Sequence, residues 1–144
     1  MIALDTNILI QAHRTELAHH VPARLRLQSL VLAGPFGLPV FCLAEFVCVV
    51  THPRIFKPAT TLETALSRLT ELTTAPNCLV LGPGPRFASL FARACSDAAA
   101  TGNLVFDAQI VAVCREHGVH EILTLDRDFA RFPGIRAVGL GGDS

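Results

Sequence analysis

Short apolar runs alternate along this chain with longer segments in which apolar residues recur every three or four positions. The short runs predict strands at 2–4, 36–41, 78–81, 121–125 and 135–140. The longer segments predict helices at 8–13, 21–33, 42–50, from 62 onward, 86–99 and 104–117, with a short helical segment between 126 and 133. Because strands that alternate with helices form parallel sheets covered on both faces, we expect an α/β fold with three α/β/α layers and a central parallel sheet of about four to five strands.

Several helix ends are marked by residues that cap or break helices. Thr6 follows the first predicted strand and is a candidate N-cap, and the stretch TTLE at 60–63 has the spacing of a capping box. Pro53 terminates the third predicted helix, because proline removes a backbone donor and clashes with the preceding turn. Gly118 supplies a C-terminal stop for the last long helix.

The composition is that of one domain able to bury a full core. The chain has 144 residues, of which 51% are hydrophobic, and we expect a single domain at 1–140 followed by a flexible C-terminal tail at 141–144. No apolar run reaches the roughly 18 residues that span a bilayer, so we expect a cytoplasmic protein without membrane association. The 5 cysteines include no Cys-x-x-Cys pair, which favours small core residues in a reducing compartment over a disulfide framework.

The overall charge does not indicate nucleic-acid binding. The formal net charge is +0, yet Lys57 is the only lysine among 12 basic residues, so the others are arginines, which suit phosphate contacts. Candidates for such contacts are Arg86, Arg14 and Arg127, with Arg24, Arg26 and Arg131 as further possibilities. Each of these side chains is equally suited to a structural role at the surface.

Acidic residues stand at the junctions where strands pass into helices. Asp5 ends the first predicted strand, Glu45 stands alone early in the apolar stretch CLAEFVCVV, and Asp107 lies early in NLVFDAQIVAV. Asp126 ends the strand ILTLD, and Asp128 follows two residues later. Two like charges about 4 Å apart repel by about 4 kcal/mol at an effective dielectric constant near 20, so these carboxylates need a positive partner. Hard oxygen ligands with open positions suit Mg²⁺ or Mn²⁺, and such a centre is suited to phosphodiester hydrolysis.

These motifs together resemble one known family. The stretch LDTNILI at the N-terminus, the lone glutamate in an apolar helix, TGNLVFDAQIVA and TLDRDF occur in this order over nearly the whole chain. In this combination the chain resembles the PIN-domain family and, within it, the VapC-type ribonuclease toxins of type II toxin-antitoxin systems. The resemblance implies a PIN-like α/β/α fold and a metal-dependent endoribonuclease that cuts structured RNA such as tRNA or rRNA, leaving 3′-hydroxyl and 5′-phosphate ends.

The resemblance also implies roles for individual residues and partners. Asp5, Glu45, Asp107 and Asp126 would be the catalytic, metal-binding acids, with Mg²⁺ or alternatively Mn²⁺ as cofactor. Asn7 and Thr124 would orient carboxylates or waters, and Asp128 would be an auxiliary ligand or a supporting group. The arginines Arg86, Arg14 and Arg127 would contact RNA. The implied partners are a VapB-type antitoxin, the RNA substrate and a second copy of the chain in a homodimer.

Other interpretations of these residues remain open at this point. Asp5 and Asp126 could be helix caps, and Asp128 could be a solvated surface acid. A haloacid-dehalogenase type phosphotransferase expects a second aspartate where this chain has Asn7, and a response-regulator receiver expects a late lysine that is missing here. The remaining alternative is a catalytically inactive PIN-like module that serves protein interaction.

Overall fold

A five-stranded parallel sheet forms the centre of the computed structural model, which describes residues 1–141. The strand order is β3-β2-β1-β4-β5, so the first strand is central and β3 and β5 form the edges. The strands are β1 Ile2–Leu4, β2 Phe36–Pro39, β3 Cys78–Leu81, β4 Glu121–Leu123 and β5 Arg136–Val138. The expected parallel sheet of four to five strands is confirmed. Residues 142–144 of the expected tail lie outside the described residues.

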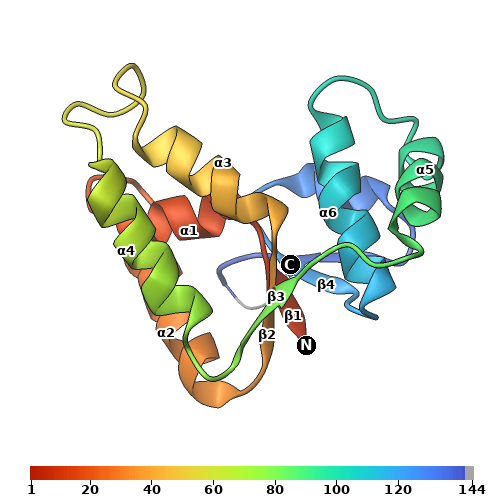
Figure 1. Ribbon diagram of the computed structural model, residues 1–144, viewed down its shortest axis with the longest axis horizontal. Helices are drawn as coiled ribbons and strands as arrows, with labels where there is room; N and C mark the ends of the chain where they lie inside the picture. The colour runs from red at the N-terminus through yellow and green to blue at the C-terminus, as the bar shows by residue number, and fades with distance from the viewer. Residues whose placement is uncertain (142–144) are drawn as a thin grey trace.

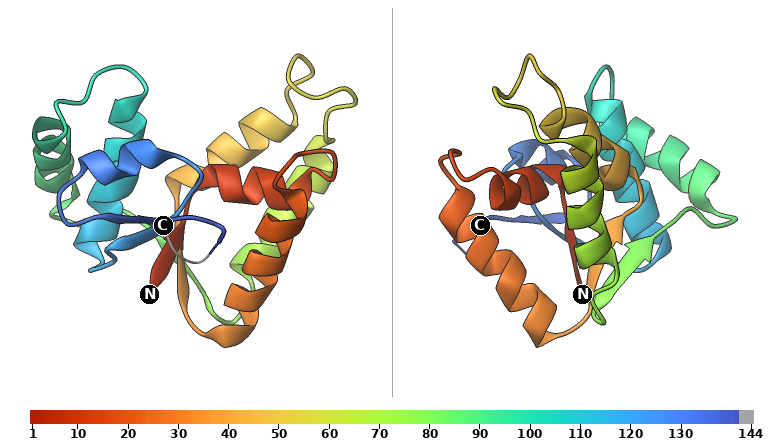
Figure 2. Two further views of the ribbon diagram at one scale, coloured as in Figure 1. Left: turned by 180° about the vertical axis from the view of Figure 1, so that it is seen from behind. Right: turned by 60° about the vertical axis from the view of Figure 1, so that its left-hand side comes forward.

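Helices cover both faces of the sheet (Figure 1). The helices are α1 Thr6–His13, α2 His20–Ala33, α3 Phe41–Val50, α4 Leu62–Thr73, α5 Phe87–Asp97 and α6 Leu104–Glu116, with the 3₁₀ helix η1 at Arg127–Arg131. Helices α1 to α4 lie on one side of β1 and β2, and α5 and α6 lie on the other (Figures 1 and 2). The three-layer α/β/α architecture is therefore confirmed. No helix within the described residues has the length and apolar character needed to cross a membrane.

Burial explains why the central strands and α6 read as continuous apolar runs. Ala3 and Leu4 in β1 and Ile122 and Leu123 in β4 are fully buried, because helices cover the sheet on both sides. Helix α6 is buried at every position from 110 to 114, where it is covered by the sheet on one side and by α5 on another. Burying each large aliphatic side chain contributes about 1.5–3 kcal/mol, so these elements provide much of the stability.

The strand order places a topological switch point between β1 and β4. The chain leaves β1 through α1 and α2 to pair with β2 on one side, and it reaches β4 from α6 on the other. The two strands are in register as Ile2 with Glu121 and Leu4 with Leu123. Their carboxyl ends therefore lie side by side at a point where the connections diverge. Open parallel sheets bind ligands at such a point.

Some predicted boundaries were wrong. Phe41 begins α3 instead of ending the preceding strand, and β4 stops at Leu123, so Asp126 follows the strand at a distance of three residues. The strands are shorter than their apolar runs because pairing with the neighbouring strand ends earlier. The last strand, expected over 135–140, is limited to 136–138 for the same reason.

Several helix ends also differ from the prediction. The N-cap of α1 is Asp5 and not Thr6, because the Asp5 carboxylate accepts the backbone N–H of Thr6. The N-cap of α4 is Thr61, one residue later than expected, and it accepts the N–H of Thr64 at 3.2 Å. Helix α5 ends at Asp97, before the predicted end at 99. By contrast, Gly118 ends α6 as predicted with a φ of +70°, a conformation that glycine adopts without steric cost.

Candidate metal centre at the carboxyl edge of the sheet

Asp5 directly follows the central strand, at the switch point between β1 and β4. Its backbone N–H donates to the Leu123 carbonyl at 3.0 Å, which continues the β1–β4 ladder by one bond. One carboxylate oxygen accepts the N–H of Thr6 at 2.7 Å, and the other accepts the hydroxyl of Thr124 at 2.7 Å. The side chain is only 6% exposed, and burial raises its pKa to about 6 despite these two hydrogen bonds. Asp5 is therefore both a helix cap and a buried acid of the candidate site.

Thr124 connects the two strand ends through one buried hydroxyl. Besides donating to Asp5, its Oγ1 accepts the backbone N–H of Asp126 at 2.9 Å and the Asn7 amide at 3.3 Å. Asn7 in turn accepts the N–H of Leu125 at 3.3 Å, so α1 and the segment after β4 are joined twice. The geometry suits the orienting role that was expected for Asn7 and Thr124.

Asp107 approaches the same edge from the opposite layer of the fold. It lies in the first turn of α6 and is half-buried. Its pKa is raised to about 7, first by burial and then by the negative charges of four neighbouring acids, which are Asp126, Asp5, Asp128 and Glu45. The fold thus brings together carboxylates that are separated by more than 100 residues in sequence.

Asp126 and Asp128 complete the cluster after β4. Asp126 caps η1 by accepting the backbone N–H of Asp128 at 2.8 Å. Carboxylate oxygens of Asp107, Asp126 and Asp128 all lie within 4.8 Å of one another, which is close enough to share a cation. Asp128 is exposed, but its position beside the other two makes it a stronger candidate ligand than its sequence context indicated.

Glu45 differs from the expectation that it would be buried toward the cluster. It lies in the second turn of α3, on the exposed face of a helix whose buried residues are Cys42, Phe46 and Val50. The apolar neighbours in sequence therefore occupy other faces of the helix. Its negative charge still contributes to the raised pKa of Asp5 and Asp107, which places it at the rim of the site.

The three arginines expected to contact RNA lie in different parts of the fold. Arg127 is exposed in η1, directly after Asp126. Arg86 lies before α5, where its backbone N–H and guanidinium donate to the side chain and backbone carbonyl of Glu116. Arg14 follows α1, whose 8 residues span about 12 Å, and therefore lies at the far end of this helix from Asp5.

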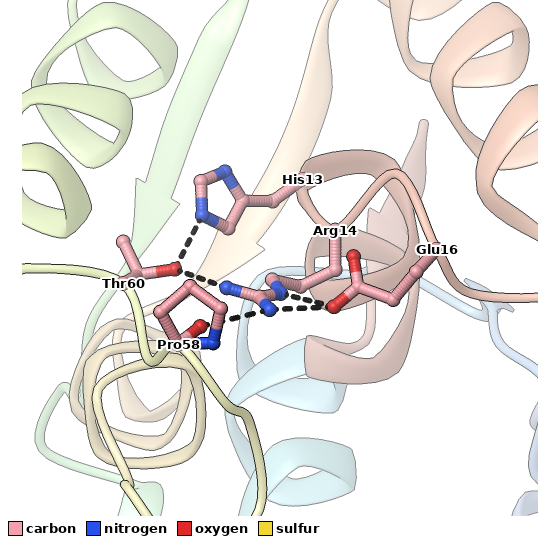
Figure 3. Close-up of polar contacts among 5 residues, drawn as sticks. All are labelled: His13, Arg14, Glu16, Pro58 and Thr60. Carbon is pink, nitrogen blue, oxygen red and sulfur yellow. Dashed lines mark hydrogen bonds and ion pairs between the residues drawn. The ribbon is translucent and has the colours of Figure 1, made fainter.

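The Arg14 guanidinium is fully engaged by contacts within the protein (Figure 3). It donates to the Glu16 carboxylate, the Thr60 hydroxyl and the Pro58 carbonyl, and it covers the ring of Phe56 at 4.4 Å. Only 14% of its side chain is exposed. An RNA contact by Arg14 would require these interactions to be broken.

Some residues that hold the surrounding loops leave no signal in the sequence. The Glu116 carboxylate at the end of α6 accepts the backbone N–H groups of Gly84 at 2.7 Å and Arg86 at 2.9 Å, fixing the loop before α5. Arg131 donates to the carbonyl of Ala98 just after α5, which satisfies a helix-end acceptor. These partners are about 30 residues apart in sequence, so no local pattern reveals them.

The charges of this edge are suited to a divalent cation. Within residues 1–141, none of the ion pairs involves Asp5, Asp107, Asp126 or Asp128. The raised pKa values of Asp5 and Asp107 report this uncompensated negative charge together with burial. An all-oxygen ligand set of this kind fits Mg²⁺ or Mn²⁺ better than zinc or copper, which prefer nitrogen or sulfur ligands.

Comparisons with known proteins agree with this geometry. A family model described as PIN domain matches residues 2–135. "Ribonuclease VapC31" of Mycobacterium tuberculosis is 34% identical over 139 residues, covering 96% of this chain and 97% of that protein. "Ribonuclease VapC43" of the same species is 37% identical over 137 residues, covering 94% of this chain and 92% of that protein.

Solved structures share the fold at lower identity. The crystal structure of VapBC2 from Rickettsia felis, bound to a promoter DNA fragment, contains a chain with a TM-score of 0.69 and 16% identity, covering 96% of this chain and 98% of that one. Mycobacterium tuberculosis VapC20, described as a Sarcin-Ricin loop cleaving toxin, gives a TM-score of 0.64 at 20% identity, covering 94% and 99%. The chain belongs to the PIN domain family and, within it, to the group of the VapC ribonucleases.

Proposed function

We propose that this protein is the toxin of a toxin-antitoxin pair and hydrolyses phosphodiester bonds of structured RNA with Mg²⁺ or Mn²⁺. The observation that carries the proposal is the cluster of Asp107, Asp126 and Asp128, whose carboxylate oxygens lie within 4.8 Å of one another, with the negative charge of Asp5 close to Asp107. The curated relatives at 34% and 37% identity match this chain over nearly their whole length, and both are named ribonucleases. Their names support an RNA substrate.

Under this proposal some of the acids bind the cation directly and others assist them. Asp5, Asp107 and Asp126 would hold the cation, Asp128 would contribute from the exposed side, and Glu45 would act from the rim. A bound divalent cation supplies positive charge beside the scissile phosphate and lowers the pKa of an attacking water. The Thr124 hydroxyl donates to the Asp5 carboxylate and accepts the backbone N–H of Asp126. Thr124 therefore fixes Asp5 and the segment that carries Asp126 relative to each other.

Attack by water predicts defined products. The bond between phosphorus and the 3′ oxygen breaks, so the products carry 3′-hydroxyl and 5′-phosphate ends. Attack by the RNA's own 2′-hydroxyl would instead leave a cyclic phosphate. End-group analysis of the cleaved RNA therefore tests the chemistry separately from the identity of the substrate.

The proposal includes an inhibitory partner. The solved relatives include VapBC complexes, in which the toxin is crystallised with its antitoxin. We infer a VapB-type antitoxin for this chain, a homodimeric assembly of the toxin and a cytoplasmic location. Co-expression with the antitoxin should permit growth under conditions in which expression of the toxin alone arrests it.

The decisive experiment incubates the purified protein with total bacterial RNA in Mg²⁺, in Mn²⁺ and in EDTA, and sequences the new 5′ ends. We expect discrete cuts that require metal and that disappear in Asp107→Asn. A folded protein, free of inhibitor, that cuts nothing with either metal would favour the inactive interaction module. Its acids would then need another explanation, since no ion pair within the described residues compensates their charge.

A further inference from the structure

One exposed phenylalanine directly precedes a residue of the acidic cluster in the sequence. The chain contains 9 phenylalanines and neither tryptophan nor tyrosine. Eight of these rings are buried or half-buried, whereas Phe106 is 61% exposed. It directly precedes Asp107 in the first turn of α6. The only exposed phenylalanine within residues 1–141 is therefore next in sequence to a residue of the candidate metal centre.

Packing does not explain the position of Phe106. It belongs neither to the hydrophobic core nor to the half-buried residues that pack against it. The aromatic pairs among the described residues involve Phe41, Phe46, Phe87 and other rings, but not this one. Single exposed apolar side chains are common at protein surfaces, so what distinguishes Phe106 is its place directly before Asp107 at the candidate metal centre.

Two of the three candidate arginines are not free to contact RNA phosphates. The net charge is +0, and the guanidinium groups of Arg14 and Arg86 already serve partners within the protein. Of the three candidate arginines, this leaves Arg127, which is exposed directly after Asp126, for a contact with phosphate. Stacking of a base on an aromatic ring gives affinity that does not depend on net charge, at about 5- to 150-fold per base.

We propose that Phe106 stacks against an unpaired nucleobase next to the scissile phosphate. Phe106 and Asp107 are consecutive residues in the first turn of α6, so under this proposal the stacked base belongs to a nucleotide near the phosphate at Asp107. The substrate is then RNA in which at least one base at the cut site is free of pairing, because a base in a duplex has no open face. This inference rests on the proposed ribonuclease function and adds a substrate requirement to it.

The first test measures stacking without cleavage. The probe is a short single-stranded RNA that contains 2-aminopurine, whose fluorescence is quenched by stacking, and it is bound to protein in an Asp107→Asn background. We expect Phe106→Leu, which keeps apolar bulk, to weaken binding at least 5-fold and to relieve the quenching. Phe106→Trp should retain both. Leu66→Ala, which removes an exposed apolar side chain from α4, is the matched control and should change neither.

The second test uses two hairpins of equal sequence at the cut site, one with this site in the loop and one with it in the stem. The otherwise unmodified enzyme should prefer the loop hairpin. Phe106→Leu should raise the KM for the loop hairpin more than it lowers kcat, and the preference for the unpaired site should shrink. Thermal unfolding of each variant verifies that the fold is intact.

The outcomes separate the two proposals. If quenching by Phe106 is observed but no RNA is cleaved with metal, the stacking role stands and the proposed hydrolysis fails. If RNA is cleaved while Phe106→Leu keeps unchanged binding, quenching and loop preference, the stacking role is overturned. Dissociation of a dimer by Phe106→Leu, with normal binding by the remaining monomer, would assign the ring to a contact between copies and also overturn it.

Discussion

Asp107 combines a functional position with an energetic cost. Its pKa is raised from 3.8 to about 7, so between about pH 4 and 7 the folded state retains a proton that the unfolded state has released. The free energy of unfolding of the metal-free protein must therefore fall as the pH rises through this window. Because the side chain is half-exposed, solvent screening reduces the effect below that of a fully buried acid.

Asp107→Asn should accordingly abolish cleavage and stabilise the metal-free fold at high pH. We expect the variant to be more stable than the unmodified protein by about 1–2 kcal/mol at pH 8 and by close to nothing at pH 4. Chemical denaturation in EDTA at both pH values measures this difference. A variant that is less stable at pH 8, or that still cleaves RNA, would contradict the placement of Asp107 in the charged cluster.

Replacing Thr124 should break the hydrogen bonds that join Asp5 to Asp126 without changing the charge of the site. Thr124→Val keeps the shape but leaves one Asp5 carboxylate oxygen without its hydroxyl donor and the Asp126 N–H without its side-chain acceptor. We expect a stability loss of about 1–3 kcal/mol and a loss of metal affinity of about 10- to 100-fold. Calorimetric titration with Mn²⁺ measures the second effect. Thr124→Ser should restore both properties, and equal behaviour of the Val and Ser variants would sink the assignment.

At the level of elements, the connection between α3 and α4 is tied to the end of α1. Arg14 donates to Thr60 and Pro58, and the His13 ring also contacts the Thr60 hydroxyl at 2.9 Å (Figure 3). The Arg14 guanidinium also lies over the ring of Phe56. Thr60 is thus used as an anchor for the loop, while its neighbour Thr61 caps α4. The two threonines that resembled a single capping signal have separate tasks.

Arg14→Ala should release this loop. We expect faster hydrogen exchange and protease cleavage over residues 51–60, with a stability loss of about 1–2 kcal/mol from the lost hydrogen bonds and cation–π contact. Arg68→Ala, which removes an exposed arginine from α4, is the matched control and should leave this loop unchanged. If Arg14 contacts RNA as first expected, its variant will instead weaken cleavage strongly while the exchange of the loop stays the same.

At the level of the whole molecule, the two layers of helices and the sheet meet at one charged edge. Carboxylates from β1, α6 and the segment after β4 repel one another there, so a cation that neutralises them should stabilise the entire fold. A ligand at 100 times its Kd stabilises by about 2.7 kcal/mol. For a chain of this size, Mg²⁺ at that concentration should raise Tm by about 5–10 °C. Calorimetry with and without Mg²⁺ tests this, and Asp107→Asn should show a much smaller rise.

The sequence by itself determined the order and type of the elements. The spacing of apolar residues records which faces are buried, and this periodicity is local, so the alternation of strands and helices could be predicted. The sequence also predicted that acids would gather at the carboxyl edge of the parallel sheet, and carboxylate oxygens of Asp107, Asp126 and Asp128 do lie within 4.8 Å of one another there. Their role as metal ligands stays a prediction. Family motifs added the identity of the fold, which the match over residues 2–135 confirms.

Only the tertiary structure decided which groups touch. Glu45 was expected to be buried because its neighbours in sequence are apolar, but the rotation of α3 exposes it. The bridge from Thr124 to Asp5 spans 119 residues, and the contact of Arg14 with Thr60 spans 46. Hydrogen bonds and charge interactions act over a few ångströms in space, regardless of separation along the chain. They are therefore set by the packing of distant elements, which local periodicity does not record.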